Sequence, residues 1–283
     1  MKRLITLLIL ACMVLSGSSL AGRVEKVTEV VEIEGADEVV INCDLGAGEF
    51  TIRPKEMGEV AIVDIIYDTR RIDYNVSAET KRNRRYVELE SEHRRSGNID
   101  TEDNLWDITL STKYPTTLEM DIGACDAEFD LGGLKLKEVT LDIGAASGLI
   151  TFSKPNPIRL EEFDVDAGAS SLTIEMIGNA NFDYFSIDGG AGSFELDFRG
   201  KYDGESRISL DIGLGSADIV LPEGVPVRIE TEGDNWLSSV DIHGKYVDEV
   251  DEDVYESDDF DRSDTRIIVD LSVGLGSVDI YFK

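Results

Sequence analysis

The residues of this chain with the clearest chemical potential are aspartates that recur at one place in a repeated motif. Seven segments contain an apolar residue, aspartate (serine in the last), one further residue and glycine, followed by small side chains. The aspartates of five consecutive segments are 21, 24, 22 and 23 positions apart: Asp121, Asp142, Asp166, Asp188 and Asp211. Ca²⁺ takes about six to eight oxygen ligands, so one carboxylate from each stacked unit would contribute to a cation site.

A second interpretation of these aspartates is structural. Aspartate side chains accept backbone N–H bonds in tight turns, and each of the five lies two positions before a glycine. Paired carboxylates also cleave glycosidic bonds, but here they occupy equivalent positions and no unit is singled out. We therefore expect no enzyme, no cofactor and no metal site, with calcium bound by the five aspartates as the alternative.

Histidine and cysteine offer little further chemistry. His93 and His243 are 150 positions apart, which leaves little material for a histidine metal cage or a catalytic triad. Cys43 and Cys125 remain after removal of the export signal described below, and an oxidising compartment permits a disulfide between them. Two small buried thiols are the alternative interpretation.

Basic residues are concentrated in one segment of an acidic chain. The 283 residues include 58 acidic and 27 basic side chains, for a formal charge of −31, so the chain repels phosphate backbones and we expect no nucleic-acid partner. Residues 53–95 nevertheless contain ten basic side chains, including Arg82, Arg84 and Arg85. This patch would dock an anionic membrane surface or wall polymer; the alternative is a set of hairpin turns paired with the acidic remainder.

The elements that must position these residues are strands. In Val139–Ile143 the aliphatic residues alternate with polar ones, a glycine-rich corner follows, and Leu149–Phe152 forms a second short run. Two strands and two corners per unit predict an all-β, β-helix-like solenoid of roughly 22-residue coils, stacked about 4.8 Å apart. A β-sandwich is the alternative fold.

The chain begins with an export signal. Lys2 and Arg3 precede the apolar run Leu4–Leu15, and small residues favour cleavage after Ala21. Residues 1–21 are thus predicted to be a signal peptide, and the mature protein to be periplasmic, cell-surface or secreted. A lipoprotein signal ending at Cys12 is the weaker alternative.

Two further regions follow the signal peptide. Residues 22–113 are predicted to form a β-rich N-terminal region, and residues 114–283 the repeated solenoid. Within the latter, residues 248–264 hold ten acidic side chains and one basic one, which predicts a solvated acidic loop.

Several of these segments carry a resemblance to bacterial families. Val40–Ile52, the strand Trp106–Leu110 and Asp121–Ala124 resemble the N-terminal toast-rack domain of bacterial envelope proteins. Leu221–Ile229 and Val273–Ile280 are similar to the C-terminal domain of LiaF-like cell-wall-active antibiotic response proteins. The resemblance implies a β-helix-like, non-enzymatic envelope module, which in some relatives restrains a membrane sensor kinase. Those relatives usually carry N-terminal membrane helices, where this chain has a signal peptide.

Together these observations predict a non-catalytic exported envelope protein that acts as a binding or scaffold module. The alternatives are a cell-envelope stress-response regulator that contacts a membrane sensor, and a calcium-stabilised surface adhesin. The expected partner is an envelope protein or polymer, with contact to a membrane surface as a further hypothesis. Self-association through the open ends of the solenoid is expected unless they are capped, and residues 57–113 are the expected cap.

Overall fold

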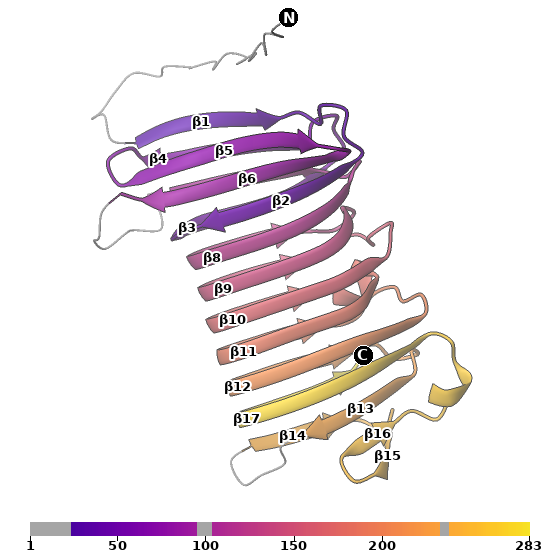
Figure 1. The fold of residues 1–283 in the computed structure, drawn as a ribbon. Helices are drawn as coiled ribbons and strands as arrows, with labels where there is room; N and C mark the ends of the chain where they lie inside the picture. Colours follow the sequence, from indigo (N-terminus) through magenta and orange to yellow (C-terminus); the bar gives the residue numbers. More distant parts are fainter. Residues whose placement is uncertain (1–23, 95–103, 233–237) are drawn as a thin grey trace, which may run out of the picture.

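The computed structural model describes residues 24–94, 104–232 and 238–283, and within them almost every segment is a β-strand. The predicted signal peptide lies outside the described residues. Figure 1 shows one long stack of strands, with the N-terminal strands at one end and the C-terminal strands at the other. The strands of the first region are β1 (Val24–Val31), β2 (Glu38–Leu45), β3 (Gly48–Lys55), β4 (Ala61–Asp68), β5 (Ile72–Lys81), β6 (Arg84–His93) and β7 (Asn104–Ser111).

The repeated region consists of long strands, each of which makes most of one coil. These are β8 (Pro115–Asp130), β9 (Lys135–Thr151), β10 (Leu160–Glu175), β11 (Phe182–Asp197), β12 (Glu205–Leu221) and β17 (Arg266–Phe282). Each bends at its glycine corner, so that a first limb before the corner faces a second limb after it. Phe185 on the first limb of β11 and Phe198, just beyond its second limb, meet across the interior with ring centroids 5.3 Å apart.

Neighbouring coils are parallel and in register. Leu141 of β9 lies beside Val165 of β10, which lies beside Ile187 of β11, and the same holds along both limbs. Inward-facing aliphatic and aromatic side chains form one continuous core. Each fully buried side chain of this kind contributes roughly 1.5–3 kcal/mol. The predicted all-β solenoid with coils of about 22 residues is therefore confirmed.

The corners are a column of glycines in close backbone contact. A Cβ placed on Gly168 would lie 2.6 Å from the carbonyl oxygen of Gly144, and one on Gly190 would lie 2.6 Å from that of Gly168. These distances are shorter than any ordinary carbon–oxygen contact, so only glycine fits. The small residues that the sequence places at each corner are thus required by the distance between coils.

At the N-terminal end the solenoid changes from parallel to antiparallel pairing. β2 and β3 form the first coil, with β6 parallel to β2 and β7 parallel to β3. Beyond them β5 is antiparallel to β6, β4 is antiparallel to β7, and β1 is antiparallel to β4. Antiparallel neighbours can follow one another through short turns, so these strands end the stack of coils.

The C-terminal end contains the segment that was expected to be an acidic loop. β13 (Val227–Glu232) and β14 (Ser238–His243) both pair with β17. Residues 248–264 are not one loop: they contain β15 (Asp248–Asp251), β16 (Val254–Glu256) and a short 3₁₀ helix, η3 (Phe260–Arg262). β16 pairs with β13, and Tyr255 packs against the core, which is why the acidic segment is ordered there. A second 3₁₀ helix, η2 (Ile177–Ala180), follows β10.

Replacing a corner glycine by alanine tests the close approach of the coils. Gly168→Ala is expected to cost about 1–3 kcal/mol, because its methyl group would collide with a backbone carbonyl that cannot move without shifting the next coil. Gly58→Ala is the matched control, since nothing lies within 4 Å of its Cβ position. Urea unfolding of both variants measures the difference; equal stability would show that the corner has room to spare.

Candidate functional site

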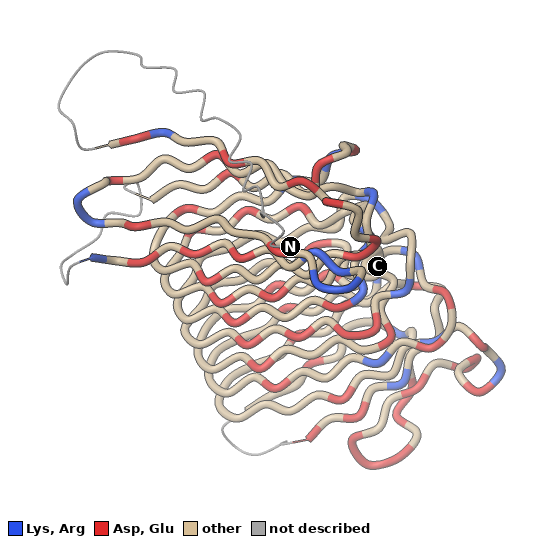
Figure 2. The backbone as a smooth tube through the Cα atoms, turned by 45° about the horizontal axis from the view of Figure 1, so that its top comes forward, with Lys and Arg blue, Asp and Glu red and all other residues tan. Residues whose placement is uncertain are grey.

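The five repeat aspartates form one straight column on the outer face of the first limb. Asp121 lies beside Asp142, Asp142 beside Asp166, Asp166 beside Asp188, and Asp188 beside Asp211. Asp44 extends the column at one end and Ser272 at the other. We call the five residues from Asp121 to Asp211 the aspartate column. Figure 2 shows acidic residues following one another down this face of the coils.

The column is a set of exposed like charges. Partial burial by neighbouring atoms, followed by the charges of Asp121 and Asp166, raises the pKa of Asp142 above its ordinary value. Polar and acidic side chains two positions earlier share the face, among them Asp164 and Ser186. A shallow groove of about 400 Å³ runs along Asp142, Asp166 and Asp188. This face therefore presents negative charge at regular spacing.

The aspartates do not have the expected turn-forming role. Within the described residues no hydrogen bond joins any of the five to a backbone N–H, because their side chains point outward from the strand. By contrast, Asp130 and Asp197 do accept backbone N–H groups in the turns that follow their strands. Among the described residues, no group of three or more histidine, cysteine or acidic side chains is arranged to hold a metal ion. Calcium bound by the column stays a prediction.

The outer face of the second limb carries a serine column that was not anticipated. Each serine follows the motif's aspartate, or the serine that replaces it, by five positions, and Ser239 of β14 ends the row: Ser147, Ser171, Ser193, Ser216, Ser277 and Ser239. A groove of about 470 Å³ opens beside Ser147 and Ser171, with Glu49, Asp126 and Glu128 along it. The constant offset of five residues was the sequence signal for this column.

The three arginines of the predicted anionic-surface patch do not share a surface. Arg85 is buried, with its Nη1 atom 2.6 Å from Glu34. The Nε atom of Arg84 lies 3.0 Å from a carboxylate oxygen of Glu38. Arg82 is exposed in the turn between β5 and β6. Arg85 alternates inward with the core residues of β6, so it cannot face a membrane; contact through Arg82 stays a prediction.

The two cysteines are also separated. Cys43 and Cys125 are both free and buried, so they are the two buried thiols of the alternative interpretation and the possible disulfide is not formed. Their positions explain this, because Cys43 lies beside Met120 in the next coil, whereas Cys125 lies beside Gly48, past the corner. Burial raises the pKa of the Cys43 thiol to about 12 and that of Cys125 to about 11, which keeps both protonated.

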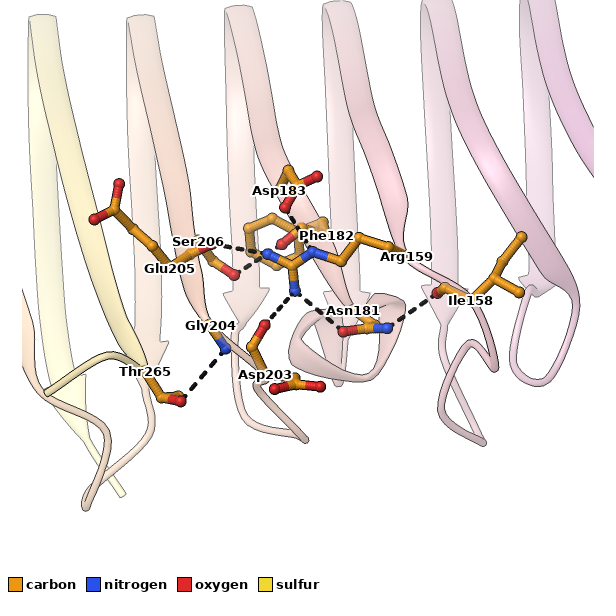
Figure 3. A network of polar contacts seen from close by, with 10 residues as sticks. All are labelled: Ile158, Arg159, Asn181, Phe182, Asp183, Asp203, Gly204, Glu205, Ser206 and Thr265. Atoms are coloured by element: carbon orange, nitrogen blue, oxygen red, sulfur yellow. Dashed lines mark hydrogen bonds and ion pairs between the residues drawn. The ribbon is translucent and has the colours of Figure 1, made fainter.

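A polar cluster around Arg159 holds the start of three coils together, as Figure 3 shows. Its guanidinium donates to a carboxylate oxygen of Asp183 at 2.6 Å, and to the backbone carbonyls of Asp203 and Glu205 at 2.8 Å each. It also donates to the side chain of Asn181, whose amide in turn donates to the carbonyl of Ile158. One side chain thus joins the loops before β10, β11 and β12 through hydrogen bonds. The bonded residues lie too far apart in the chain for the sequence to reveal this cluster.

Replacing Arg159 by lysine is expected to destabilise the fold by about 1–3 kcal/mol, because an ammonium group cannot reproduce the planar fork that reaches three loops. Arg207→Lys is the control, since Arg207 is half exposed and, within the described part of the chain, forms its ion pair with Glu205 of its own strand. Its effect should stay within about 0.5 kcal/mol. Chemical denaturation compares them, and an unaffected Arg159→Lys protein would contradict the clamp.

Neutralising one carboxylate in the middle of the aspartate column should stabilise the protein. The pKa of Asp142 is raised in the folded chain, so its charged form is disfavoured there and stability should rise as pH falls toward its titration. Asp142→Asn is expected to gain about 0.2–1 kcal/mol at neutral pH, and less in high salt. Asp211→Asn should gain less, because Ser272 lies on one side of it. A loss of stability in Asp142→Asn, measured by urea unfolding, would contradict the repulsion.

Comparison with solved structures gives matches to bacterial proteins over most of this chain. A candidate cell adhesion protein from Clostridium sporogenes is 21% identical, with a TM-score of 0.49; the match covers 92% of this chain and all of that one. A candidate adhesin from Bacteroides fragilis is 10% identical, with a TM-score of 0.40 and coverage of 90% and 97%. A candidate lipid binding protein from Parabacteroides distasonis is 13% identical, with a TM-score of 0.33 and coverage of 92% and 97%. No curated protein sequence matches the chain.

Among the described residues, no helix has the length and apolar character needed to cross a membrane.

The sequence itself matches a family model. Residues 20–174 match the N-terminal domain of toast_rack, DUF2154, which includes the first coils and three members of the aspartate column. The expected likeness of the C-terminal part to LiaF-like proteins lies beyond this match. Because the matched segment is more than half of the chain, the protein belongs to the toast-rack family, whose N-terminal domain it contains.

Proposed function

We propose that this chain is a non-catalytic scaffold of the bacterial envelope that binds an envelope protein or polymer along its outer faces. The observation that carries the proposal is the register of the aspartate column: five coils present the same carboxylate at the same place. Such an array suits a repetitive or extended partner, because each coil offers an equivalent contact at a spacing of about 4.8 Å.

The environment of the carboxylates supports binding rather than turnover. Acid–base catalysis needs two groups whose surroundings move their pKa values apart, one toward the acid and one toward the base. The five column residues are all exposed, and each lies beside another member of the column. Partial burial and then the charges of Asp121 and Asp166 raise the pKa of Asp142, which reflects repulsion within the array and not a paired acid and base.

Export forms the second part of the proposal. The predicted signal peptide, residues 1–21, would deliver the chain outside the cytoplasm. Its cleavage would change the formal charge from −31 to −33, because two basic residues and no acidic one are removed. A partner that meets this surface there would be recognised by positive charge or by groups that accept a bridging cation.

In-cell crosslinking followed by mass spectrometry tests the proposal. The triple variant Asp142→Asn, Asp166→Asn and Asp188→Asn should lose the material that the unaltered protein captures, because the centre of the column is neutral. The control Glu249→Gln, Asp251→Asn and Glu252→Gln removes the same charge from the C-terminal end and should retain it.

Equal capture by both variants would remove the column from consideration as a binding surface. Equal loss would show that net charge, and not the column, attracts the partner. Performing the capture with Ca²⁺ and with a chelator separates direct contact from a calcium-stabilised adhesin, since only the latter depends on the cation.

A further inference from the structure

Strand β1, at the N-terminal end of the solenoid, has an open and regular edge. Among the described residues, β1 pairs with β4 only, through eight consecutive antiparallel partners from Val24–Asp68 to Val31–Ala61. β1 contains no proline, no glycine and no residue with positive φ. Alternate residues of such a strand direct their N–H and C=O groups to the open side, where another strand can pair.

The edge strands β14 and β15 at the C-terminal end are both shorter than β1, and β15 also has defences that β1 lacks. β15 is only four residues long, is exposed throughout, and carries three acidic side chains. Its pairing with β16 also shifts register between Glu249 and Asp251. Short, charged and irregular edge strands prevent pairing with other chains. The two ends of the solenoid are therefore not equivalent.

The outer face of β1 also exposes apolar side chains. Val24 is 58% exposed and Val30 is 51% exposed, although both are large aliphatic residues in a strand. Ile62 and Ile66 lie beside Val30 and Lys26 on β4 and are themselves only partly buried. An apolar margin at an unpaired edge marks a surface that another strand covers.

The sequence of β1 matches itself in one antiparallel register. In a dimer with a two-fold axis perpendicular to the sheet, the outer face of one β1 continues into the outer face of the other. Side chains directly opposite each other then share a face, so the axis must pass between two copies of the same residue. Near the middle of β1 that residue is Val27 or Thr28. About Val27, Glu25 would lie opposite Glu29 of the second copy on the inner face. About Thr28, Lys26 lies opposite Val30 and the glutamates lie opposite valines, so no like charges meet. The Lys26 stem would then cover the exposed Val30.

We propose that the mature chain forms a two-fold dimer in which β1 pairs antiparallel with β1 of a second copy, centred on Thr28. Cleavage after Ala21 would leave two residues before β1, too few to pair along its eight. A second copy supplies a strand of matching length and charge. The sheet then continues across the axis, and the dimer closes without leaving β1 free. This inference is independent of the partner proposed for the aspartate column.

Sedimentation velocity on the mature chain, residues 22–283, tests the dimer. The unaltered protein should sediment at twice the monomer mass, more completely in about 0.5 M NaCl than at low salt, because the two acidic copies repel each other. Val30→Lys places an ammonium group opposite Lys26 of the second copy and should give monomers. The control Val250→Lys changes an equally exposed valine, 59% exposed on β15, and should remain dimeric. Both sites are exposed, so circular dichroism should show both variants folded.

Cysteine crosslinking tests the register. Thr28→Cys should form an intermolecular disulfide under mild oxidation, because directly opposed residues of antiparallel strands have Cβ atoms about 4.5–5.5 Å apart. The native thiols are buried and protonated, so the unaltered protein is the blank. Ser239→Cys, on the open edge strand β14, should not crosslink. A monomer at both salt concentrations, a dimer unaffected by Val30→Lys, or a ladder of larger species crosslinked through Ser239→Cys would each overturn the proposal.

Discussion

The contact on which this structure depends is the approach of each corner glycine to the carbonyl oxygen of the glycine one coil earlier. At Gly144, Gly168 and Gly190 the corner has room for a hydrogen atom and no larger group. Successive strands therefore bend at equivalent positions and stay parallel through the bend. The two limbs of every coil then face each other and enclose the core. A side chain at any of these corners would separate the coils, and the columns on both outer faces would lose their register.

That register has an electrostatic cost which the core offsets. Aspartates directly beside one another disfavour the fold by about 0.2–1 kcal/mol for each neighbouring pair. Each coil also buries several aliphatic or aromatic side chains, and each of these contributes roughly 1.5–3 kcal/mol. T-shaped contacts connect Phe152, Phe163 and Phe185 in successive coils. The interior can therefore support a repulsive outer surface.

The ends of the solenoid depend on a different interaction. In the middle, each strand has an equivalent neighbour on both sides, and local alternation is sufficient to specify its partners. At the N-terminal end, pairing becomes antiparallel and polar side chains add contacts between the strands, whereas at the C-terminal end β14 stays parallel to β17 and β16 is antiparallel to β13. Tyr74 of β5 donates to Glu29 of β1, and Arg85 reaches Glu34 from within the core. These contacts join segments more than 40 residues apart.

Local pattern determined the part of this protein that repeats. Alternating aliphatic residues, glycine corners and a period of about 22 residues predicted the all-β coil, and equal spacing predicted that Asp142 and its equivalents share a face. Tertiary structure decided what depends on distant partners: the ordered hairpin within residues 248–264, the inward direction of Arg85, the separation of Cys43 from Cys125, and the three loops held by Arg159. The physical reason is that each strand of a repeat has its partner one period away in the chain, so the period itself predicts which strands pair. A contact that occurs once joins segments whose separation in the chain follows no rule, so only the packing of the folded chain determines it.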